Sequence, residues 1–177
     1  MILLGVDPGL LRMGYGVIEA VGNDVRLKEG GVIRGGTSEV PVERRLAVLY
    51  DGLREVVEEF RPDAMALEEV YSHYAHPGTA VLMAHARGIA CLVAAQAVIP
   101  LHSYASTRLK HSMVGNGRAS KAQVQRAVQA RLKLTQLPEP NDVADALALA
   151  LCHWQAIGGA GAAVSGPGAG RATGAVV

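Results

Sequence analysis

The sequence predicts an α/β fold in which a mixed, five-stranded sheet is flanked by α-helices. Three apolar strands come first along the chain, and two further strands then alternate with helices, which is typical of a mixed sheet. The chain has 177 residues, of which 50% are hydrophobic and 19% charged, so it can bury a substantial core. We expect one domain over residues 1–157 and a Gly- and Ala-rich, disordered tail over 158–177, because the tail has no apolar face.

The element boundaries follow from apolar spacing and from turn residues. Short apolar runs bounded by Gly, Asn, Asp or Pro indicate strands, and apolar residues at every third or fourth position indicate helices. The expected strands are 1–7, 14–22, 25–34, 64–70 and 101–105. The expected helices are 41–60, 79–98, 107–113, 119–134 and 141–157.

The expected helix over 79–98 is apolar on nearly all of its sides, so the sheet alone cannot cover it. A second copy of the chain could cover the remainder, and part of a dimer contact is expected here. The longest apolar stretch, residues 89–100, is interrupted by Gln96 and is well short of the roughly 20 residues of a membrane span. We therefore expect no membrane segment.

The N-terminus and the cysteines indicate the compartment. The first residues, MILLGVD, lack the basic region and long apolar stretch of a secretory signal. Cys91 and Cys152 are too few for a disulfide framework, and both are interpreted as buried thiols. These features predict a cytoplasmic protein.

Positive charge is concentrated in one part of the chain. Residues 101–138 contain seven Lys and Arg residues and no Asp or Glu, although the net charge of the whole chain is only +1. Such a stretch indicates binding to a phosphate backbone, although a solvated helix face can also be basic. Arg108, Arg118 and Arg126 lie in this stretch and are candidate DNA backbone contacts.

Acidic residues stand at the ends of predicted elements. Asp7 closes the first strand, Glu68 or Glu69 closes the fourth, and Asp142 and Asp145 open the last helix. Residues three positions apart share one side of a helix. Carboxylates brought together need cations, and Mg²⁺ takes oxygen ligands. Two such ions about 4 Å apart can activate a water molecule and stabilise the leaving oxygen in phosphodiester cleavage.

Some of these acids also have an ordinary interpretation. Asp142 could cap the last helix, and Asp7, which precedes a Pro-Gly pair, could be a turn residue. Asp145 is harder to explain in this way, because it lies in an apolar helix where an unpaired charge is unfavourable. The coincidence of all of these acids at element ends favours a metal site.

Several segments carry a family pattern. They are GVDPGLLRMGYGVIE, DAMALEEVYSHY, MAHARG, YASTRLKHSMVGNGRASKAQVQ and NDVADALALALCH. In this order and spacing they resemble the RuvC family of Holliday junction resolvases, from about residue 1 to 157. The resemblance implies a ribonuclease H-like fold, a homodimer, and two Mg²⁺ per active site, with Mn²⁺ as a substitute. It also implies resolution of four-way DNA junctions in recombination and repair, together with the branch-migration proteins RuvA and RuvB.

The resemblance also assigns functional residues. The family's metal-binding acids match Asp7, Glu68, Asp142 and Asp145, its substrate-contacting lysines match Lys110 and Lys121, and its base-contacting aromatic matches Tyr71. Strand alternation leaves Glu68 and Glu69 open, and the family motif selects Glu68. Lys121 is the candidate for a phosphate clamp that offsets charge in the transition state.

The residues around these positions are less informative. Tyr74, in the same loop as Tyr71, is attributed to local packing, and His73 and His76 alone are weak grounds for a soft-metal site. Three glycines, Gly9, Gly14 and Gly16, either permit a tight return and close packing after the first strand or are ordinary turn residues.

Three other functions are compatible with parts of this pattern. An actin-like or hexokinase-like phosphotransferase also begins with an Asp-x-Gly strand end, but that fold repeats the motif, and Asp7-Pro8-Gly9 is its single occurrence here. A junction-binding protein without catalysis would not need the acids. A nuclease of the same fold that acts on RNA is distinguished only by comparing substrates.

Overall fold

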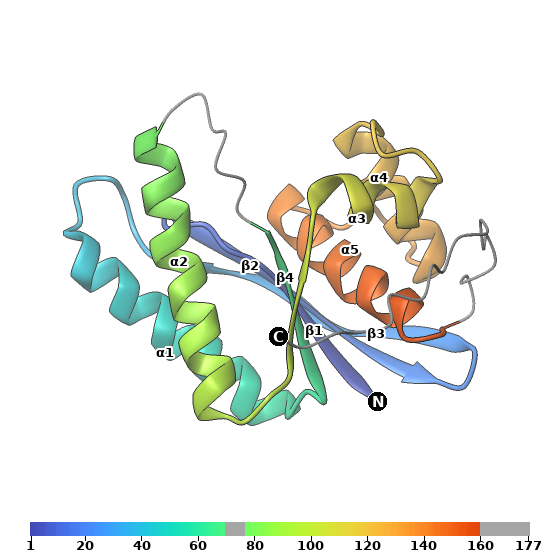
Figure 1. Cartoon of the computed structure of the whole chain (residues 1–177), viewed down its shortest axis with the longest axis horizontal. Coiled ribbons are helices and arrows are strands. Elements are labelled where there is room, and N and C mark those ends of the chain that lie inside the picture. The colour runs from blue at the N-terminus through green and yellow to red at the C-terminus, as the bar shows by residue number, and fades with distance from the viewer. Residues whose placement is uncertain (70–76, 160–177) are drawn as a thin grey trace, which may run out of the picture.

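The computed structural model describes residues 1–69 and 77–159, and the side chains of all of these except 77–79. It has a five-stranded mixed sheet with helices on both faces, as the sequence predicts (Figure 1). The strands are β1 (Ile2–Asp7), β2 (Arg12–Val21), β3 (Asp24–Arg34), β4 (Ala64–Glu68) and β5 (Leu101–Tyr104). The helices are α1 (Val42–Phe60), α2 (Pro77–Gln96), α3 (Ser106–Val114), α4 (Lys121–Arg131) and α5 (Asn141–Ala156). The predicted elements are all present and differ from these bounds only near their ends.

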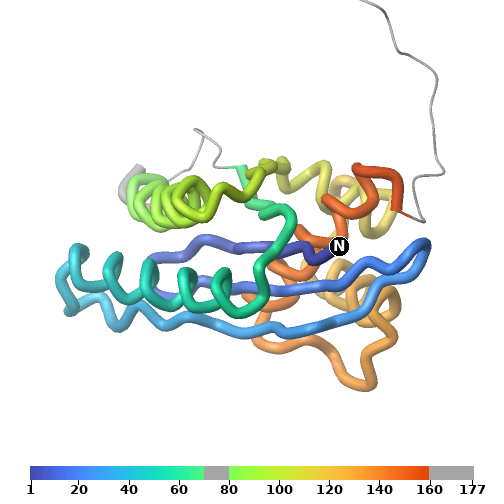
Figure 2. Tube along the Cα trace, turned by 90° about the horizontal axis from the view of Figure 1, so that it is seen from below, coloured from blue at the N-terminus to red at the C-terminus, as the bar shows by residue number. Residues whose placement is uncertain are grey.

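The sheet has the order β3-β2-β1-β4-β5. Strands β1, β2 and β3 form an antiparallel meander, whereas β4 and β5 run parallel to β1. Figure 2 shows β2 and β3 extending across almost the full width of the molecule. Because parallel strands end at the same edge of a sheet, Asp7 and Glu68 lie on adjacent strands, one residue beyond the paired Val6 and Leu67.

Helix α5 lies directly on one face of the sheet, with α3 and α4 beside it (Figure 1). Between residues 143 and 154 every side chain of α5 is buried except that of Asp145. These side chains form one core cluster with residues of β1, β2, β4 and β5. An α5 that is buried over three turns holds the residues of its first turns in a defined place relative to the sheet.

Glycines let the α5 backbone approach the sheet closely. A Cβ at Gly5 would overlap the carbonyl oxygen of Ala146, and one at Gly14 would overlap the carbonyl oxygen of Asp142. Only a residue without Cβ can occupy these positions while α5 stays in contact with β1 and β2. Close packing is therefore the reason for Gly14.

Helices α1 and α2 cover the opposite face and contribute to a second core cluster (Figure 1). Helix α2 buries small side chains, among them Ala86 and Ala90, against this core. Its outer side keeps Val81, Leu82 and Leu92 between 40% and 54% exposed. The apolar helix that the sequence predicts is thus left with an uncovered apolar side.

The described chain ends two residues into the expected tail. Gly158 and Gly159 follow the last turn of α5, and the backbone N–H of Gly159 donates to the carbonyl oxygen of Trp154 at 2.9 Å. The rest of the expected tail, 160–177, lies outside the described residues. Cys152 is buried as expected, whereas Cys91 is only partly buried, and both thiols are free. No helix in the described part of the chain combines the length and apolar character that a membrane crossing requires.

Candidate active site

Asp7 and Glu68 form the sheet side of the candidate site. Each is the last residue of its strand, and each is partly buried, whereas the neighbouring Glu69 is exposed. Burial and the negative charges of Asp145, Glu68 and Asp142 raise the pKa of Asp7 to about 7. Burial raises the pKa of Glu68 as well, with Asp145 adding to the effect. These mutual effects show that carboxylates from β1, β4 and α5 share one region.

Asp142 and Asp145 form the helix side of the site, in the first two turns of α5. The residue before α5 is Pro140, and no side chain caps the helix. Asp142 is therefore not the cap of α5, although its charge lies in the first turn of the helix, and its carboxylate forms an ion pair with Arg12. Gly14 lies under Asp142 and Gly5 under the next turn, so the glycine contacts also place the two acids.

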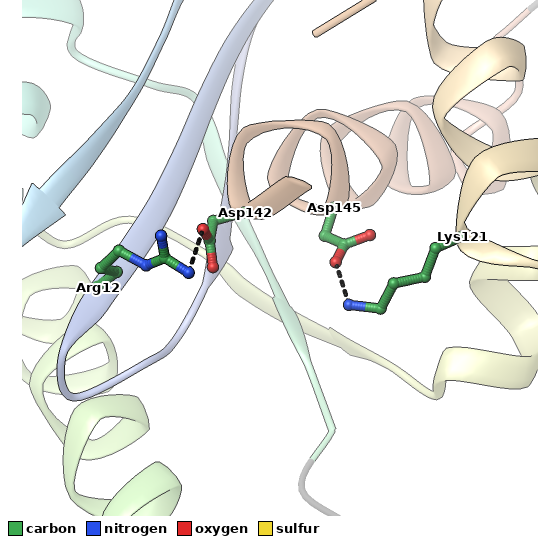
Figure 3. Close-up of polar contacts among 4 residues, drawn as sticks. All are labelled: Arg12, Lys121, Asp142 and Asp145. Atoms are coloured by element: carbon green, nitrogen blue, oxygen red, sulfur yellow. Dashed lines mark hydrogen bonds and ion pairs between the residues drawn. The ribbon is translucent and has the colours of Figure 1, made fainter. Parts of the chain in front are cut away.

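A lysine and an arginine form ion pairs with the two acids of α5 (Figure 3). Lys121, the first residue of α4, places Nζ 3.1 Å from Oδ2 of Asp145. Arg12, the first residue of β2, places Nη2 3.6 Å from Oδ2 of Asp142. In Figure 3 the two basic side chains reach the start of α5 from opposite sides. The Asp145 carboxylate raises the pKa of Lys121, so this lysine stays charged at neutral pH.

A small pocket of about 90 Å³ opens beside these residues. Its lining is Glu68, Ser106, Leu109, Lys110, Lys121, Val124, Asp145 and Leu149. Acidic and basic side chains line it together, a combination that suits a phosphate group held by lysines beside bound metal.

The donor set fits hard divalent cations. All four acids supply carboxylate oxygens, the ligands that Mg²⁺ takes, and burial followed by the charges of the other three acids raises the pKa of Asp7. In the described ranges, no three Asp, Glu, His or Cys side chains are already arranged around one ion position. The two carboxylates of α5 are instead in ion pairs with Lys121 and Arg12.

Comparison with known proteins decides the family. A family model described as "Crossover junction endodeoxyribonuclease RuvC" matches residues 3–153. The chain belongs to the RuvC family. A relative of that name from Rhodopirellula baltica is 50% identical over 150 residues, which cover 85% of this chain and 84% of the relative.

Solved RuvC structures agree with this assignment. The Thermus thermophilus RuvC structure matches with a TM-score of 0.81 and 31% identity, covering 89% of this chain and 97% of that one. A structure of T. thermophilus RuvC in complex with Holliday junction substrate also gives a TM-score of 0.81, with 33% identity over 86% of this chain and 92% of that one. The fold is therefore the ribonuclease H-like fold of RuvC.

The residues that the sequence singles out fall into three groups in the structure. Asp7, Glu68, Asp142, Asp145, Lys110 and Lys121 are brought to one end of the sheet. Arg118 and Arg126 are exposed around α4, and exposed Arg108 stacks on the ring of Tyr104 at 5.0 Å. Tyr71 lies outside the described residues, as do Tyr74, His73 and His76.

Sequence reasoning missed Arg12 and Ser106. Ser106 hydrogen-bonds Glu68 and moderates the rise in its pKa, but a serine at a helix start carries no distinguishing signal. Arg12 stands in the glycine-rich segment GLLRMGYG, three residues after Gly9. Its positive charge in this segment, within an N-terminal half that is predominantly acidic, marks Arg12 as a candidate. Nothing in the sequence indicates its partner.

Proposed function

We propose that this chain is a structure-specific DNA endonuclease that resolves Holliday junctions by paired, symmetric nicks in opposing strands. It would serve homologous recombination and DNA repair in the cytoplasm. The observation that carries the proposal is the meeting of four carboxylates and Lys121 at one end of the sheet. Membership of a family named for crossover junction endodeoxyribonuclease activity supports the choice of substrate.

Asp7, Glu68, Asp142 and Asp145 would hold two Mg²⁺, with Mn²⁺ as a substitute. Bound in a pair, such ions supply an activated water and stabilise the leaving oxygen of a phosphodiester. Asp7 is central to this role, because burial and then the charges of the other three acids raise its pKa to about 7. Above that pH Asp7 is charged in the metal-free protein and attracts cations more strongly. Cleavage leaves 5′-phosphate and 3′-hydroxyl ends.

The lysines would hold the scissile phosphate. Lys121 reaches Asp145 from α4, and Lys110 lines the same pocket from α3. A phosphate that enters the pocket can take the ammonium group of Lys121 from Asp145, since an exposed ion pair of this kind is weak. Lys121 then offsets charge as the transition state develops. Arg108, Arg118 and Arg126 would position the DNA backbone, and Tyr71 would contact bases.

Paired nicks require two sites, and a homodimer supplies them. A two-fold dimer presents two equivalent centres to a nearly two-fold junction. The exposed apolar side of α2, with Val81, Leu82 and Leu92, is the surface we assign to part of this contact. We also expect cooperation with RuvA and RuvB. Light scattering during gel filtration should give the mass of two chains at micromolar concentration, and a monomer would contradict the paired-cut proposal.

A cleavage assay tests the function directly. Purified protein is incubated with a synthetic four-way DNA junction, a linear duplex and an RNA hybrid, with and without Mg²⁺. We expect symmetric nicks in the four-way junction and in neither of the other two substrates. These nicks should appear only when Mg²⁺ is present. Cleavage of RNA in preference to the junction would identify the wrong substrate.

An Asp7→Asn variant separates a nuclease from a binding protein. It should bind the junction in a gel-shift assay and leave it uncut. Asp51→Asn, an exposed acid of α1 on the other face of the sheet, is the matched control and should cleave normally. Unchanged cleavage by Asp7→Asn would remove the basis of the proposed mechanism.

A further inference from the structure

Two arginines face each other at the active-site end of the sheet. Arg12 and Arg34 are the first residue pair of the β2–β3 ladder, and both are exposed. Residues directly opposite in an antiparallel pair project to the same face, and like charges there repel. Arg12 points to the α5 face, because it pairs with Asp142, so Arg34 projects to this face too.

Among the described residues, acidic side chains neutralise the two arginines only in part. Within residues 1–69 and 77–159, Arg12 is 3.6 Å from Asp142, and no ion pair involves Arg34. The Arg12 side chain is 58% exposed, and an ion pair so accessible to water is weak. An arriving anion can therefore replace the carboxylate of Asp142 without a large loss of stability.

The position of the pair relative to Lys121 indicates which anion. Arg12 and Lys121 approach the start of α5 from opposite sides (Figure 3). Lys110 and Lys121 come from α3 and α4, whereas Arg12 and Arg34 come from the β2–β3 hairpin. A DNA strand whose scissile phosphate lies over the acids extends past them in two directions, and the lysines occupy only one. Guanidinium groups bind phosphate oxygens through two parallel hydrogen bonds.

We propose that Arg12 and Arg34 form a second phosphate-binding site, which holds the DNA backbone on the side of the catalytic centre away from Lys121. The proposal rests on the proposed function and adds a contact surface to it. Its ligand is the phosphate of the substrate strand next to the cut, and its contacts position the DNA without reading sequence.

The salt dependence of junction binding tests this proposal. An Asp7→Asn background prevents cleavage, and binding to a four-way junction is measured over a range of KCl at one Mg²⁺ concentration. Each phosphate contact contributes about 0.9 to the slope of log K against log salt. Because the proposed homodimer carries each arginine twice, Arg12→Gln/Arg34→Gln removes four contacts per junction and should reduce the slope by about 3.6. Arg26→Gln, an exposed arginine at the far end of the same hairpin, should leave it unchanged.

The single variant Arg34→Gln separates DNA binding from a local structural role. Arg34 has no ion-pair partner within the described residues, so loss of its charge should not disturb the acids. A slope lower by about 1.8, one contact from each protomer of the dimer, supports the proposal, and an unchanged slope overturns it. If only Arg12→Gln had an effect, and that effect was on Mg²⁺ affinity rather than on the slope, Arg12 would serve Asp142 alone and the proposal would be wrong.

Failure of the proposed function would look different. If the parent protein neither binds nor cuts the junction, the resolvase assignment fails before any arginine variant is compared. If the parent cuts the junction and both arginine variants keep its salt slope, only the second phosphate site is excluded.

Discussion

The two faces of the sheet are packed in different ways. On one face α5 touches the strands through backbone atoms, with Gly5 and Gly14 under its carbonyl oxygens. On the other face α1 and α2 pack through side chains, and α2 keeps an exposed apolar side. Where a glycine occurs on that face, as at Gly52 in α1, an added Cβ would meet only the side chain of Ile33, at 2.7 Å.

This difference follows the location of the chemistry. The distances from Asp142 and Asp145 on α5 to the acids at the strand ends, Asp7 and Glu68, must stay fixed. A helix whose backbone touches the backbone of the sheet cannot shift toward it without a clash. Side-chain packing on the opposite face allows small adjustments, because rotamers can change. The comparison predicts that substitutions on the α5 face affect cleavage strongly and that those on the α1–α2 face mainly affect stability.

The largest expected effect is that of Gly5→Ala. Its Cβ would overlap the Ala146 carbonyl oxygen, so α5 must move away from the sheet, at or above the upper end of the roughly 1–3 kcal/mol typical of overpacking. We expect a large fall in the urea midpoint and loss of cleavage. Gly52→Ala is the matched control: its Cβ would meet side-chain atoms of Ile33 and no backbone atom among its three nearest contacts, and better helix propensity, about 1 kcal/mol, offsets part of that contact, so its loss should be much smaller. Equal losses in both variants would contradict the comparison.

Lys121→Met should reduce cleavage by about 10²–10³-fold, the range for removing one group that stabilises charge in a transition state. The long apolar side chain preserves packing at the start of α4 and removes only the ammonium group. Single-turnover cleavage with saturating protein measures the chemical step. Lys133→Met, whose Nζ is 3.4 Å from Asp24 instead, is the control and should cleave at the normal rate.

Asp7→Asn should stabilise the metal-free protein at alkaline pH. Because the folded-state pKa of Asp7 is about 7 and its ordinary value is 3.8, the folded state binds this proton more tightly than the unfolded state. This favourable contribution is present below the ordinary pKa and is lost as pH rises through 7. In EDTA, the Tm of the wild type should therefore fall more between about pH 5 and pH 8 than that of the variant.

Addition of metal gives the second half of this test. Mg²⁺ at about pH 8 should raise the Tm of the wild type, since binding to the folded state stabilises it by mass action, and raise that of Asp7→Asn much less. A variant that gains as much as the wild type would show that Asp7 is not a ligand.

The smallest effect concerns Gly88, an exposed glycine of α2 with nothing within 4 Å of an added Cβ. Gly88→Ala should stabilise the protein by about 1 kcal/mol through helix propensity and leave cleavage unchanged. Chemical denaturation and the junction assay measure the two quantities. A loss of cleavage here would mean that the α1–α2 face is coupled to the active site, directly or through the proposed dimer contact, because Gly88 shares the exposed side of α2 with Val81 and Leu92.

Much of the fold could be predicted because each element has a local signature. Apolar runs ended by Asp7 and Glu68 marked β1 and β4, and the embedded Asp145 marked a buried helix with one charged position. The order of pairing was harder, because nothing local to β4 shows that it lies beside β1. Glu68 is partly buried beside Asp145 and Glu69 is exposed, which is compatible with the choice of Glu68 that the family motif makes.

The site was predictable to the extent that its residues stand at element ends. The family pattern contributed Lys110 and Lys121, whose place in the pocket depends on how α3 and α4 fold over α5. Arg12 could not be assigned, because its partner Asp142 is 130 positions away in the chain and meets it only through the β1–β2 turn. The assignments of Tyr71 and of the tail remain predictions.

The exposed row of Val81, Leu82 and Leu92 has a practical consequence for engineering. Backbone contacts hold α5 on the other face of the sheet. Redesign of the α1–α2 layer can therefore change thermostability without changing the cleavage activity. The row itself is the exception, because a change there that improves solubility would also weaken any pairing of two chains.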